Sequence, residues 1–394
     1  MKAVTYMCEK TYIGAVISDI HAGAMDAVTL LEELDKGFLK YLKSLKILDY
    51  VVITGDLFDN KLSLNSDHTK YIFICLKKLA DICIKKNAKL RIIKGTTFHD
   101  NRQLDILKFL STSNLDIKIY DTVDTEELFP NFNVLYIPEE YMSNKDEYYK
   151  EYFNQTYDMV FGHGLFNEVA FVAKSQMSEV THNKAPIFKS EEILNICKGP
   201  VFFGHIHKAQ QIKDRIYYVG SYSRWIFGEE EPKGFMIVAY TPETSKFEVE
   251  FIENQLAPLY NTMLIDYNSS FYKNDENQQI NYIISMVQNL NVERLRIIFN
   301  IPEDYPNPTL LTNLINDVFS KYKYIKVVIN NNSREKQKKK EMEDKIKMLL
   351  TTYDFIFDKG VSTEEKLSRF IKLKYNKDIS IPRMRNYLYQ KINF

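Results

Sequence analysis

The sequence lacks the features that mark membrane-spanning and disulfide-bonded proteins. No apolar run approaches the roughly 20 residues that a membrane-spanning helix needs, and residues 1–12 contain no signal-peptide core. The four cysteines, Cys8, Cys75, Cys83 and Cys197, form no CxxC pair, and Cys75 and Cys83 fall in a helical pattern that predicts a place in the core. These absences favour a reduced, intracellular protein without a membrane segment.

An excess of charge of either sign is also absent. Lys and Arg together number 52, as do Asp and Glu, so the net charge is zero and no strongly basic surface is indicated. Any contact with nucleic acid must then come from local patches. The sequence contains neither a glycine-rich phosphate loop nor a Ser-His-Asp arrangement. With 45% hydrophobic and 26% charged residues, the 394-residue chain fits a globular protein of two or three domains.

Histidine is scarce, with seven in the chain, and two of them stand in the block Gly204-His205-Ile206-His207. The block follows the apolar run 200–203, which is typical of the end of a buried strand. Alternation along an extended chain places His205 and His207 on the same side. Paired imidazoles at a strand end fit a divalent metal site, and two polar residues in a turn are the alternative.

The N-terminal part of the sequence alternates buried strands with helices. Apolar runs predict strands at 13–17, 50–54 and 90–93, and helical stripes predict helices over 27–46, with Asp26 as N-cap, and around 72–83. This β-α-β-α-β order predicts a parallel sheet, in which sites form beyond the carboxyl ends of the strands. A polar block follows each of these strands.

Seven polar residues follow strand ends, and we expect them at one edge of a single sheet. They are Asp19, His21, Asp56, His99, His163, His205 and His207. Five of the seven histidines belong to this set, and the other two, His68 and His182, are expected to be ordinary surface or loop residues. Mixed carboxylate and imidazole ligands suit manganese or iron. Two such ions activate water and stabilise the oxygens of an in-line phosphoryl displacement.

The remaining sequence predicts further elements and three domains. Strands are predicted at 132–137 and 159–161, an antiparallel hairpin from 216–219 and 235–240, and short helices at 102–112 and 190–197. We expect domain 1–257, a small α/β domain 258–330, and a linker with helices over 331–394. In the last domain, helices are predicted over 362–374, with Ser362 and Glu365 as a capping box, and over 383–392.

The polar blocks resemble, in their order, those of the calcineurin-like metallophosphoesterases. The blocks are Asp-x-His, Gly-Asp-x-x-Asp, Gly-x-x-x-His-Asp, Gly-His-Gly and Gly-His-x-His. Gly55-Asp56-Leu57-Phe58-Asp59 and the stretch Gly220 to Phe235 resemble the SbcD-type nuclease subunits of double-strand-break repair, with relatives in phages. The resemblance implies an α/β fold, a metallophosphoesterase β-sandwich flanked by helices, with a small α/β capping domain that contacts DNA and a helical C-terminal tail.

The resemblance also implies roles for single residues. Asp19, His21, Asp56 and His207 would hold one divalent ion, and Asp56 would bridge to a second ion held with His163 and His205. Both ions are expected to be manganese. His99 corresponds to the catalytic histidine, which contacts the scissile phosphate and assists the leaving oxygen.

One block departs from the family pattern. The family reads Gly-Asn-His-Asp, in which the Asn binds the second ion, whereas this chain reads Gly95-Thr96-Thr97-Phe98-His99-Asp100. Three replacements are open: a hydroxyl of Thr96 or Thr97, a water molecule, or His99 turned toward the metal.

Residues around the predicted site also have two interpretations. Four aromatic residues either stack on bases of a DNA end or pack the fold, namely Phe98, Tyr222, Trp225 and Phe227. Three cations either contact phosphates or serve the fold, namely Arg102, Lys208 and Arg224.

The sequence therefore predicts a metal-dependent DNA nuclease, exonuclease or endonuclease, that hydrolyses phosphodiesters in the cytoplasm of a bacterium or a phage-infected host. Expected partners are DNA and an SbcC-type ABC ATPase with a coiled coil, which the helices of 362–392 would bind, with a homodimer inside a heterotetramer. Packing of these helices against the small domain is the alternative. A phosphoesterase of nucleotides or phosphoproteins, an inactive DNA-binding scaffold, and a structural assembly protein remain rival functions.

Overall fold

The chain divides into two compact units in a computed structural model. The structure describes residues 10–110, 114–169, 185–266, 276–290, 292–302, 305, 307–331, 355 and 360–383. The first unit consists of Met1–Thr262 with Asn291–Arg296, and the second consists of Met263–Leu290 with Ile297–Phe394. Most of the predicted linker and the helix predicted over 383–392 lie outside the described residues.

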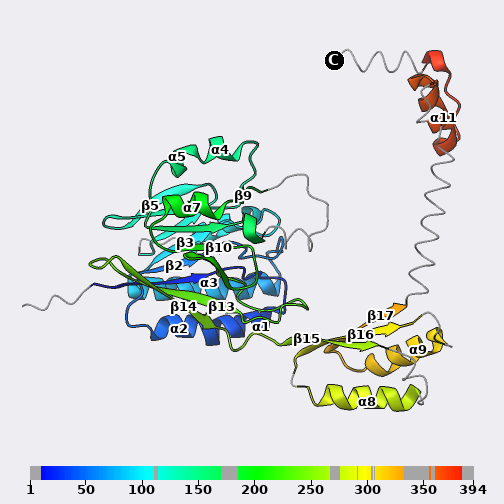
Figure 1. Cartoon of the computed structure of the whole chain (residues 1–394), viewed down its shortest axis with the longest axis horizontal. Coiled ribbons are helices and arrows are strands. Elements are labelled where there is room, and N and C mark those ends of the chain that lie inside the picture. Colours follow the sequence, from blue (N-terminus) through cyan, green and yellow to red (C-terminus); the bar gives the residue numbers. More distant parts are fainter. Residues whose placement is uncertain are drawn as a thin grey trace, which may run out of the picture. The chain divides into compact units, whose positions relative to one another are not determined.

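The first unit contains two six-stranded mixed sheets (Figure 1). The first sheet has the order β14-β13-β1-β2-β3-β4, in which β1 to β4 are parallel and β13 and β14 antiparallel. Its strands are β1 Tyr12–Ile17, β2 Tyr50–Ile53, β3 Lys89–Ile93, β4 Ile117–Tyr120, β13 Gly234–Thr241 and β14 Lys246–Glu253. The predicted strands at 13–17, 50–54 and 90–93, and their parallel order, are confirmed.

The second sheet has the order β11-β12-β10-β7-β6-β5. The four inner strands are parallel, and β11 and β5 run antiparallel at the edges. Its strands are β5 Asp124–Phe129, β6 Phe132–Ile137, β7 Met159–His163, β10 Val201–Gly204, β11 Gln210–Lys213 and β12 Ile216–Tyr218. A two-stranded sheet, β8 Leu165–Phe166 with β9 Ile187–Phe188, follows β7.

The predicted hairpin of 216–219 and 235–240 is wrong. The first of these segments, β12, pairs in parallel with β10 of the second sheet, whereas β13 pairs antiparallel with β1 and β14 of the first sheet. A hairpin turn is usually short, but the connection here runs from Val219 to Lys233 and is long enough to cross between sheets. β13 is buried along its first five residues, as a strand inside a sheet must be.

Three hydrophobic layers explain why the sheets and helices stack. Ala15 and Ile17 of β1 pack with Leu30 and Leu76 from the helices that cover the outer face of the first sheet. The intervening Val16 points the other way, into the core between the sheets, because side chains alternate along a strand. A third cluster lies between the second sheet and its own helices. The α/β fold expected from the sequence, with sheets flanked by helices, is therefore confirmed (Figure 1).

The helices of the first unit begin close to where their patterns predict. The segment predicted as one helix over 27–46 is α1 Ala27–Glu33, the π-helix Leu34–Leu39 and α2 Lys40–Ser44. Asp26 is the N-cap, accepting from the Thr29 N–H at 2.9 Å, as expected. The others are α3 Asp67–Lys86, the 3-10 helix Asn101–Leu110, α4 Lys145–Tyr148, α5 Lys150–Phe153 and α7 Ser190–Ile196.

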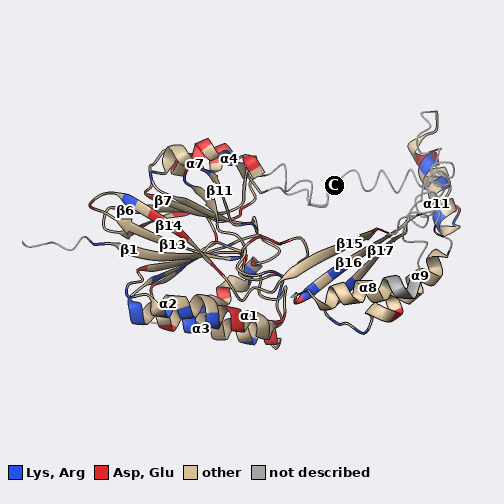
Figure 2. Cartoon of the chain, turned by 60° about the horizontal axis from the view of Figure 1, so that its bottom comes forward, with Lys and Arg blue, Asp and Glu red and all other residues tan. Residues whose placement is uncertain are grey.

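The prediction about the cysteines of α3 is confirmed by this packing. Cys75 and Cys83 are buried in the core under α3, as expected. Figure 2 shows lysines and acidic residues interspersed along the outward faces of α1 to α3. Ion pairs such as Lys77–Asp81 at 2.9 Å lie on this exposed face. The helices thus present apolar stripes to the sheet and mixed charge to solvent.

The second unit contains a small α/β arrangement, as its sequence predicts. The sheet β15-β16-β17 is formed by Tyr260–Asp266, Arg294–Ile301 and Ile325–Asn331, with helices α8 Glu276–Gln288 and α9 Pro308–Phe319. Leu295, Ile297 and Phe299 of β16 are buried. Farther along the chain, α11 spans Thr363–Tyr375, and Ser362 accepts from the Glu365 N–H at 3.2 Å, so the predicted helix and the N-cap half of the capping box are confirmed. The Glu365 carboxylate accepts from Arg369 at 2.9 Å.

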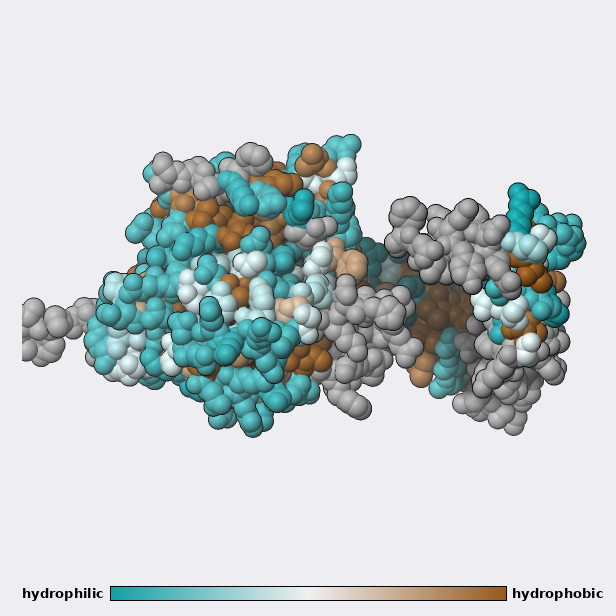
Figure 3. All heavy atoms as spheres, turned by 90° about the horizontal axis from the view of Figure 1, so that it is seen from above, coloured by the Kyte–Doolittle hydropathy of each residue, from teal (hydrophilic) through white to brown (hydrophobic). Residues whose placement is uncertain are grey.

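None of the described helices is both long and apolar enough to cross a membrane. Figure 3 shows the visible face of the first unit as mostly hydrophilic, with separate hydrophobic patches. Such scattered patches are normal for a protein surface in water.

Candidate metal centre

The loops after five strands bring the predicted polar residues together from two sheets. Asp19 and His21 follow β1, Asp56 follows β2 and His99 follows β3 in the first sheet. His163 ends β7, and the block of His205 and His207 follows β10, both in the second sheet. The expectation of a single sheet is therefore wrong. Apolar strand patterns show that a strand is buried, but they do not show which of two stacked sheets it joins.

Three groups of side chains place their ligand atoms within 4.8 Å of one another. The first is Asp19 with His21 and His207, and the second is Asp56 with His163 and His205. The third is His21 with Asp59 and His99. Nitrogen and carboxylate oxygen are the donors that divalent transition metals take in proteins. These groups of residues could therefore hold metal ions.

The backbone at the centre adopts conformations that residues other than glycine usually avoid. Eight described non-glycine residues have positive φ, and four belong to the predicted set: Asp19 at 47°, His21 at 47°, Asp56 at 49° and His205 at 92°. Left-handed backbone costs free energy outside glycine and persists where the surroundings enforce it. Its concentration here indicates that the loops are shaped for their side chains, which is a reason to look for function at this place.

Close approach of the loops leaves no room for a side chain at two glycines. A Cβ atom on Gly55 would overlap the His163 ring, and one on Gly95 would overlap the backbone and carboxylate of Asp56. Gly55 also has a φ of +94°, which glycine adopts without strain. Glycine at these positions therefore lets residues of different loops approach each other at the centre.

Asp100 fixes two of these loops to each other. Its buried carboxylate accepts from the backbone N–H groups of Gly95 at 2.7 Å, Asp56 at 3.0 Å and Phe58 at 3.1 Å. Backbone N–H groups that lack a partner in a buried place are costly. The carboxylate therefore holds the loops after β2 and β3 in one arrangement. Sequence analysis placed Asp100 in a family block without giving it this role.

Three imidazoles are oriented by a hydrogen bond on one ring nitrogen. Nδ1 of His163 contacts the Thr54 carbonyl at 2.8 Å, and Nδ1 of His207 contacts Glu229 Oε1 at 2.6 Å. Nδ1 of His21 lies 3.2 Å from Asp59 Oδ1. An acceptor on one nitrogen fixes the tautomer and leaves the lone pair of the other nitrogen for a metal. Sequence analysis missed these roles of Asp59 and Glu229, although both stand in its family blocks.

His21 provides the clearest test of whether a cation fits. Its buried Nε2 finds no hydrogen-bond partner among the described residues. The nearest acidic oxygens are Asp56 Oδ2 at 3.7 Å and Asp19 Oδ1 at 4.0 Å, and His207 Nε2 is also 4.0 Å from Asp19 Oδ1. Lone pairs of these nitrogen and oxygen atoms thus point toward one another. A buried acceptor without a donor is unfavourable. A divalent cation satisfies them all, so the residues fit the group.

Charge couples the second group. Burial alone would raise the pKa of Asp56, but the charge and hydrogen bond of His163, with His21 and His99, bring that pKa below its usual range. Burial lowers the pKa of His163, but the charge and hydrogen bond of Asp56 raise it by more. The pKa of His163 therefore lies above its ordinary value. The two side chains lie 3.3 Å apart, and each is stabilised by the opposite charge of the other. A cation beside Asp56 would replace the charge that the proton of His163 supplies.

Thr96 lies beside the residues of the second group. Its hydroxyl lies 3.3 Å from Asp56 Oδ2 and 3.4 Å from both His163 Nε2 and His205 Nδ1. Of the replacements considered from sequence, the Thr96 hydroxyl is therefore the one that adjoins all three residues of the second group. Its neighbour Thr97 is exposed.

His99 lies on the other side of the centre, near the first group. Its Nδ1 contacts the Asp59 carbonyl oxygen, and its ring is 4.6 Å from the His21 ring, edge to face. The residue is half-buried, so part of its ring is accessible. This position is compatible with a role toward a bound phosphate and also places His99 in the third possible metal group.

The surrounding aromatic residues and cations separate into two kinds. Tyr222 is buried, and its hydroxyl donates to the Glu33 carbonyl at 2.8 Å, so it packs the fold. Buried Arg224 donates to the Glu231 carbonyl at 2.7 Å and has the same kind of role. Phe98 is 73% exposed beside the centre. Trp225 lies against the rings of His21 and His207, with centroids 4.7 and 5.1 Å apart.

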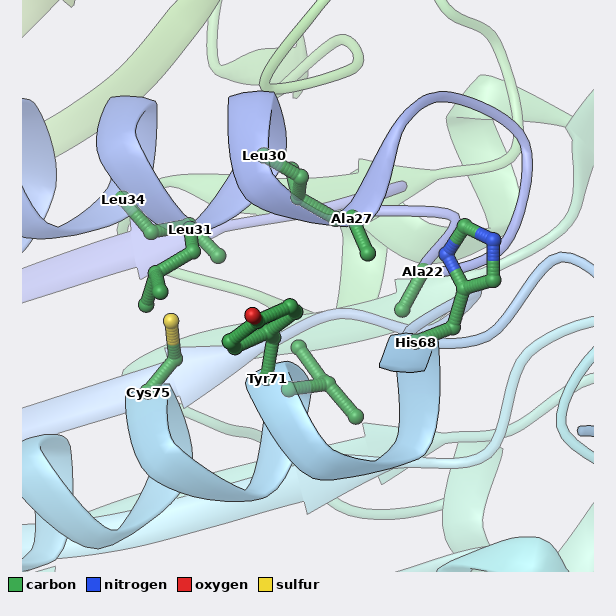
Figure 4. A pocket seen from close by; sticks show the side chains of 9 residues that line it. Ala22, Ala27, Leu30, Leu31, Leu34, His68, Tyr71 and Cys75 are labelled. Atoms are coloured by element: carbon green, nitrogen blue, oxygen red, sulfur yellow. The ribbon is translucent and has the colours of Figure 1, made fainter. Parts of the chain in front are cut away.

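The two remaining histidines do not join the centre in the described structure. His68 begins α3 and lines a small, mainly apolar cavity between α1 and α3, beside Ala22 and Ala27 (Figure 4). It is half-buried in a helix and does not lie in a loop or fully on the surface, which differs from the expectation from the sequence. His182 lies outside the described residues.

Comparison with known proteins adds little. No family model and no curated protein matches the chain. A solved crystal structure aligns with 61% of this chain and 99% of its own chain, at 13% sequence identity and a TM-score of 0.33. The functional conclusion must therefore come from the chemistry of the centre.

Proposed function

We propose that this chain is a metal-dependent phosphodiesterase that hydrolyses DNA with two divalent ions, preferably manganese. The observation that carries the proposal is the pair of buried His/Asp groups whose imidazoles are held by hydrogen bonds on the opposite nitrogen. Such orientation by an outer partner is typical of metal-binding histidines. The mixed nitrogen and oxygen donors favour manganese or iron over calcium.

Each residue has a defined task in this proposal. Asp19, His21 and His207 would hold one ion together with Asp56, and Asp56 would also hold the other ion with His163 and His205. When bound, the two ions supply Lewis acidity that lowers the pKa of water and neutralises charge on the phosphate. His99 donates a hydrogen bond to the leaving oxygen from its accessible ring.

The surface beside the centre supports a phosphate polymer as substrate. A cleft is lined by Lys94, Arg102 and Lys108 and also by Thr97, the neighbour of Thr96. Two acidic residues also line the cleft, so it carries charges of both signs and is not uniformly basic. Exposed Phe98 offers a ring on which a base of an unpaired end can stack. These features favour DNA over a free nucleotide or a phosphoprotein.

The partner in this proposal is an SbcC-type ABC ATPase with a coiled coil, in a heterotetramer with two copies of this chain in the cytoplasm. The helix α11 supports a helical docking segment, because none of its described residues is fully buried. Leu373 and Tyr375 are 51% and 58% exposed on it. An apolar helical stripe commonly binds in a groove of a partner.

The test of the function combines metal removal with one substitution. Cleavage of DNA should require manganese and stop with a chelator, and Asp56→Ala should lose nearly all activity because Asp56 serves both ions. Asp81→Ala is a matched control, since Asp81 pairs with Lys77 on the exposed face of α3. A panel of DNA, nucleotides and phosphopeptides identifies the substrate class. An Asp56→Ala protein that cleaves DNA at the wild-type rate would contradict the proposal, and metal binding without any hydrolysis would favour an inactive scaffold.

A further inference from the structure

Glu139 is a buried carboxylate at the centre that no sequence pattern singles out. It follows β6, the neighbour of β7 in the second sheet, and is 3% exposed. Its backbone N–H donates to the Lys94 carbonyl at 3.2 Å, which connects the end of β6 to the loop after β3. A charged group in such a place needs a partner of opposite charge.

The two oxygens of Glu139 have different surroundings. Oε1 accepts from the Tyr141 hydroxyl at 2.8 Å, which orients the carboxylate. Oε2 faces the second metal group and lies 3.3 Å from His205 Nδ1 and 3.4 Å from the Thr96 hydroxyl. One oxygen is therefore held from outside and the other is presented to the centre, as for the oriented imidazoles.

Two of the contacts between these atoms have the spacing of neighbouring ligands around one ion, and Glu139 reaches the group of Asp56, His163 and His205 on the side of His205 and Thr96. Donors about 2.1 Å from a common ion in tetrahedral or octahedral geometry are about 3.0 to 3.4 Å from their neighbours. Asp56 Oδ2 is 3.3 Å from His163 Nε2, and the Glu139 contact with His205 is also 3.3 Å. The Thr96 hydroxyl lies at 3.3 to 3.4 Å from all four side chains. Without Glu139, the second group offers a single carboxylate and no amide.

We propose that Glu139 binds the second ion directly, with Asp56, His163 and His205, and takes the place of a neutral amide ligand. This inference rests on the proposed two-metal function. A carboxylate adds a negative charge to the ligand set, so this position should hold its divalent cation more tightly than an amide would. Thr96 then serves as a hydroxyl neighbour of the ion rather than its main additional ligand.

The test measures metal binding rather than turnover. Purified full-length chain is titrated with Mn²⁺ by calorimetry, and electron paramagnetic resonance records whether the ions are spin-coupled. The wild-type chain should bind two ions with a coupled signal. Glu139→Ala should weaken the second ion by more than a hundredfold, beyond the 10–100-fold typical of an outer partner. It should leave the six-line signal of a single Mn²⁺.

Glu139→Gln and Glu140→Ala complete the experiment. Gln keeps an oxygen at the same place but removes the charge, so the second ion should bind about tenfold or more weakly, and this isosteric variant decides the question if Glu139→Ala does not fold. Glu140 is the matched control, because its carboxylate binds Tyr148 and the Val123 N–H instead. A second ion bound within threefold of the wild-type affinity in either Glu139 variant would overturn the inference alone. A wild-type chain that binds no Mn²⁺ would overturn the two-metal function as well.

Discussion

The residues at this centre are of two kinds. Some present ligand atoms to the possible metal positions, and others orient these ligands by hydrogen bonds. Asp59 contacts Nδ1 of His21, and Glu229 contacts Nδ1 of His207. The Thr54 carbonyl contacts Nδ1 of His163. Residues of the second kind bind no ion in the proposal. Their loss should weaken metal binding by changing the tautomer and the direction of an imidazole.

His99 is expected to assist the reaction without binding an ion. His99→Ala should retain both ions and reduce turnover by roughly a hundredfold or more, the usual size of acid–base assistance. Metal content and single-turnover cleavage measure the two effects separately, with His68→Ala as the control histidine in α3. Loss of an ion in His99→Ala would instead assign His99 to the third group, with His21 and Asp59.

Glu33 makes stability depend on pH. Burial raises its pKa from 4.5 to about 7, against the hydrogen bonds of Ser223 and Asn254, which lower it. Between these pH values the folded chain keeps a proton that the unfolded chain has lost. The free energy of unfolding contributed by this group is therefore greatest below pH 4.5 and falls as pH rises through 7.

Glu33→Gln should remove this dependence. At pH 8 the variant is expected to be more stable than the wild type by up to about 3 kcal/mol, the energy of such a pKa shift. At about pH 4.5, where the wild-type side chain is protonated when folded, the two should be similar. Urea denaturation at both pH values tests this, with Glu32→Gln as the exposed neighbouring control. An equal loss of stability in both proteins between these pH values would count against a buried, protonated Glu33.

At the scale of elements, the loops after β1, β2 and β3 behave as one assembly. The Asp19 N–H donates to the Gly55 carbonyl at 3.1 Å, and the His21 N–H donates to the Asp56 carbonyl at 3.0 Å. Asp100 adds the loop after β3 to these contacts. The left-handed residues of the centre are therefore supported by bonds between loops, which offset the cost of their conformation.

Removal of the Asp100 carboxylate should loosen this assembly. Asp100→Ala leaves three backbone N–H groups without their acceptor, at about 1–3 kcal/mol for each buried donor. We expect the free energy of unfolding to fall by roughly 3 kcal/mol or more, and manganese binding to weaken. Urea denaturation and calorimetric titration measure both. Asp105→Ala is the control, because Asp105 is exposed in the next helix and pairs with Lys108. Unchanged stability in Asp100→Ala would show that water replaces the carboxylate.

At the scale of the whole molecule, the residues after β17 are expected to serve the partner and not the metal centre. A chain ending at Asn331 keeps β15 to β17 and all residues of the metal groups. It should fold, bind manganese as the full chain does and cleave single-stranded DNA. It should no longer co-purify with the ATPase, because α11 and its exposed apolar side chains are gone.

Two results would contradict this division of tasks. Aggregation of the shortened chain would indicate that the tail covers an apolar surface of the same molecule. Full-strength binding of the ATPase by the shortened chain would place the docking surface elsewhere. A full-length chain with Leu373→Asp and Tyr375→Asp is the matched variant, since both residues are more than half exposed and their replacement removes two exposed apolar side chains of α11 but keeps the chain length.

Local patterns in the sequence were enough to locate the elements and to indicate the kind of chemistry. Apolar runs located β1, β2 and β3, local capping located Asp26 and Ser362, and polar residues after strand ends gave the histidines and aspartates that the structure brings together. Each of these signals lies within a few neighbouring residues, because strand burial, helix caps and turns depend on local spacing.

Which strands share a sheet, and which distant residues meet, depends on contacts across the fold. β12 and β13 follow each other along the chain but join different sheets, since an apolar pattern carries no information on its pairing partner. Glu139 also follows a strand, but its carboxylate meets His205 only because β7 pairs with both β6 and β10. The two residues are 66 positions apart in the chain and 3.3 Å apart in space. Contacts between loops depend on how the two sheets stack, and local spacing does not encode that arrangement.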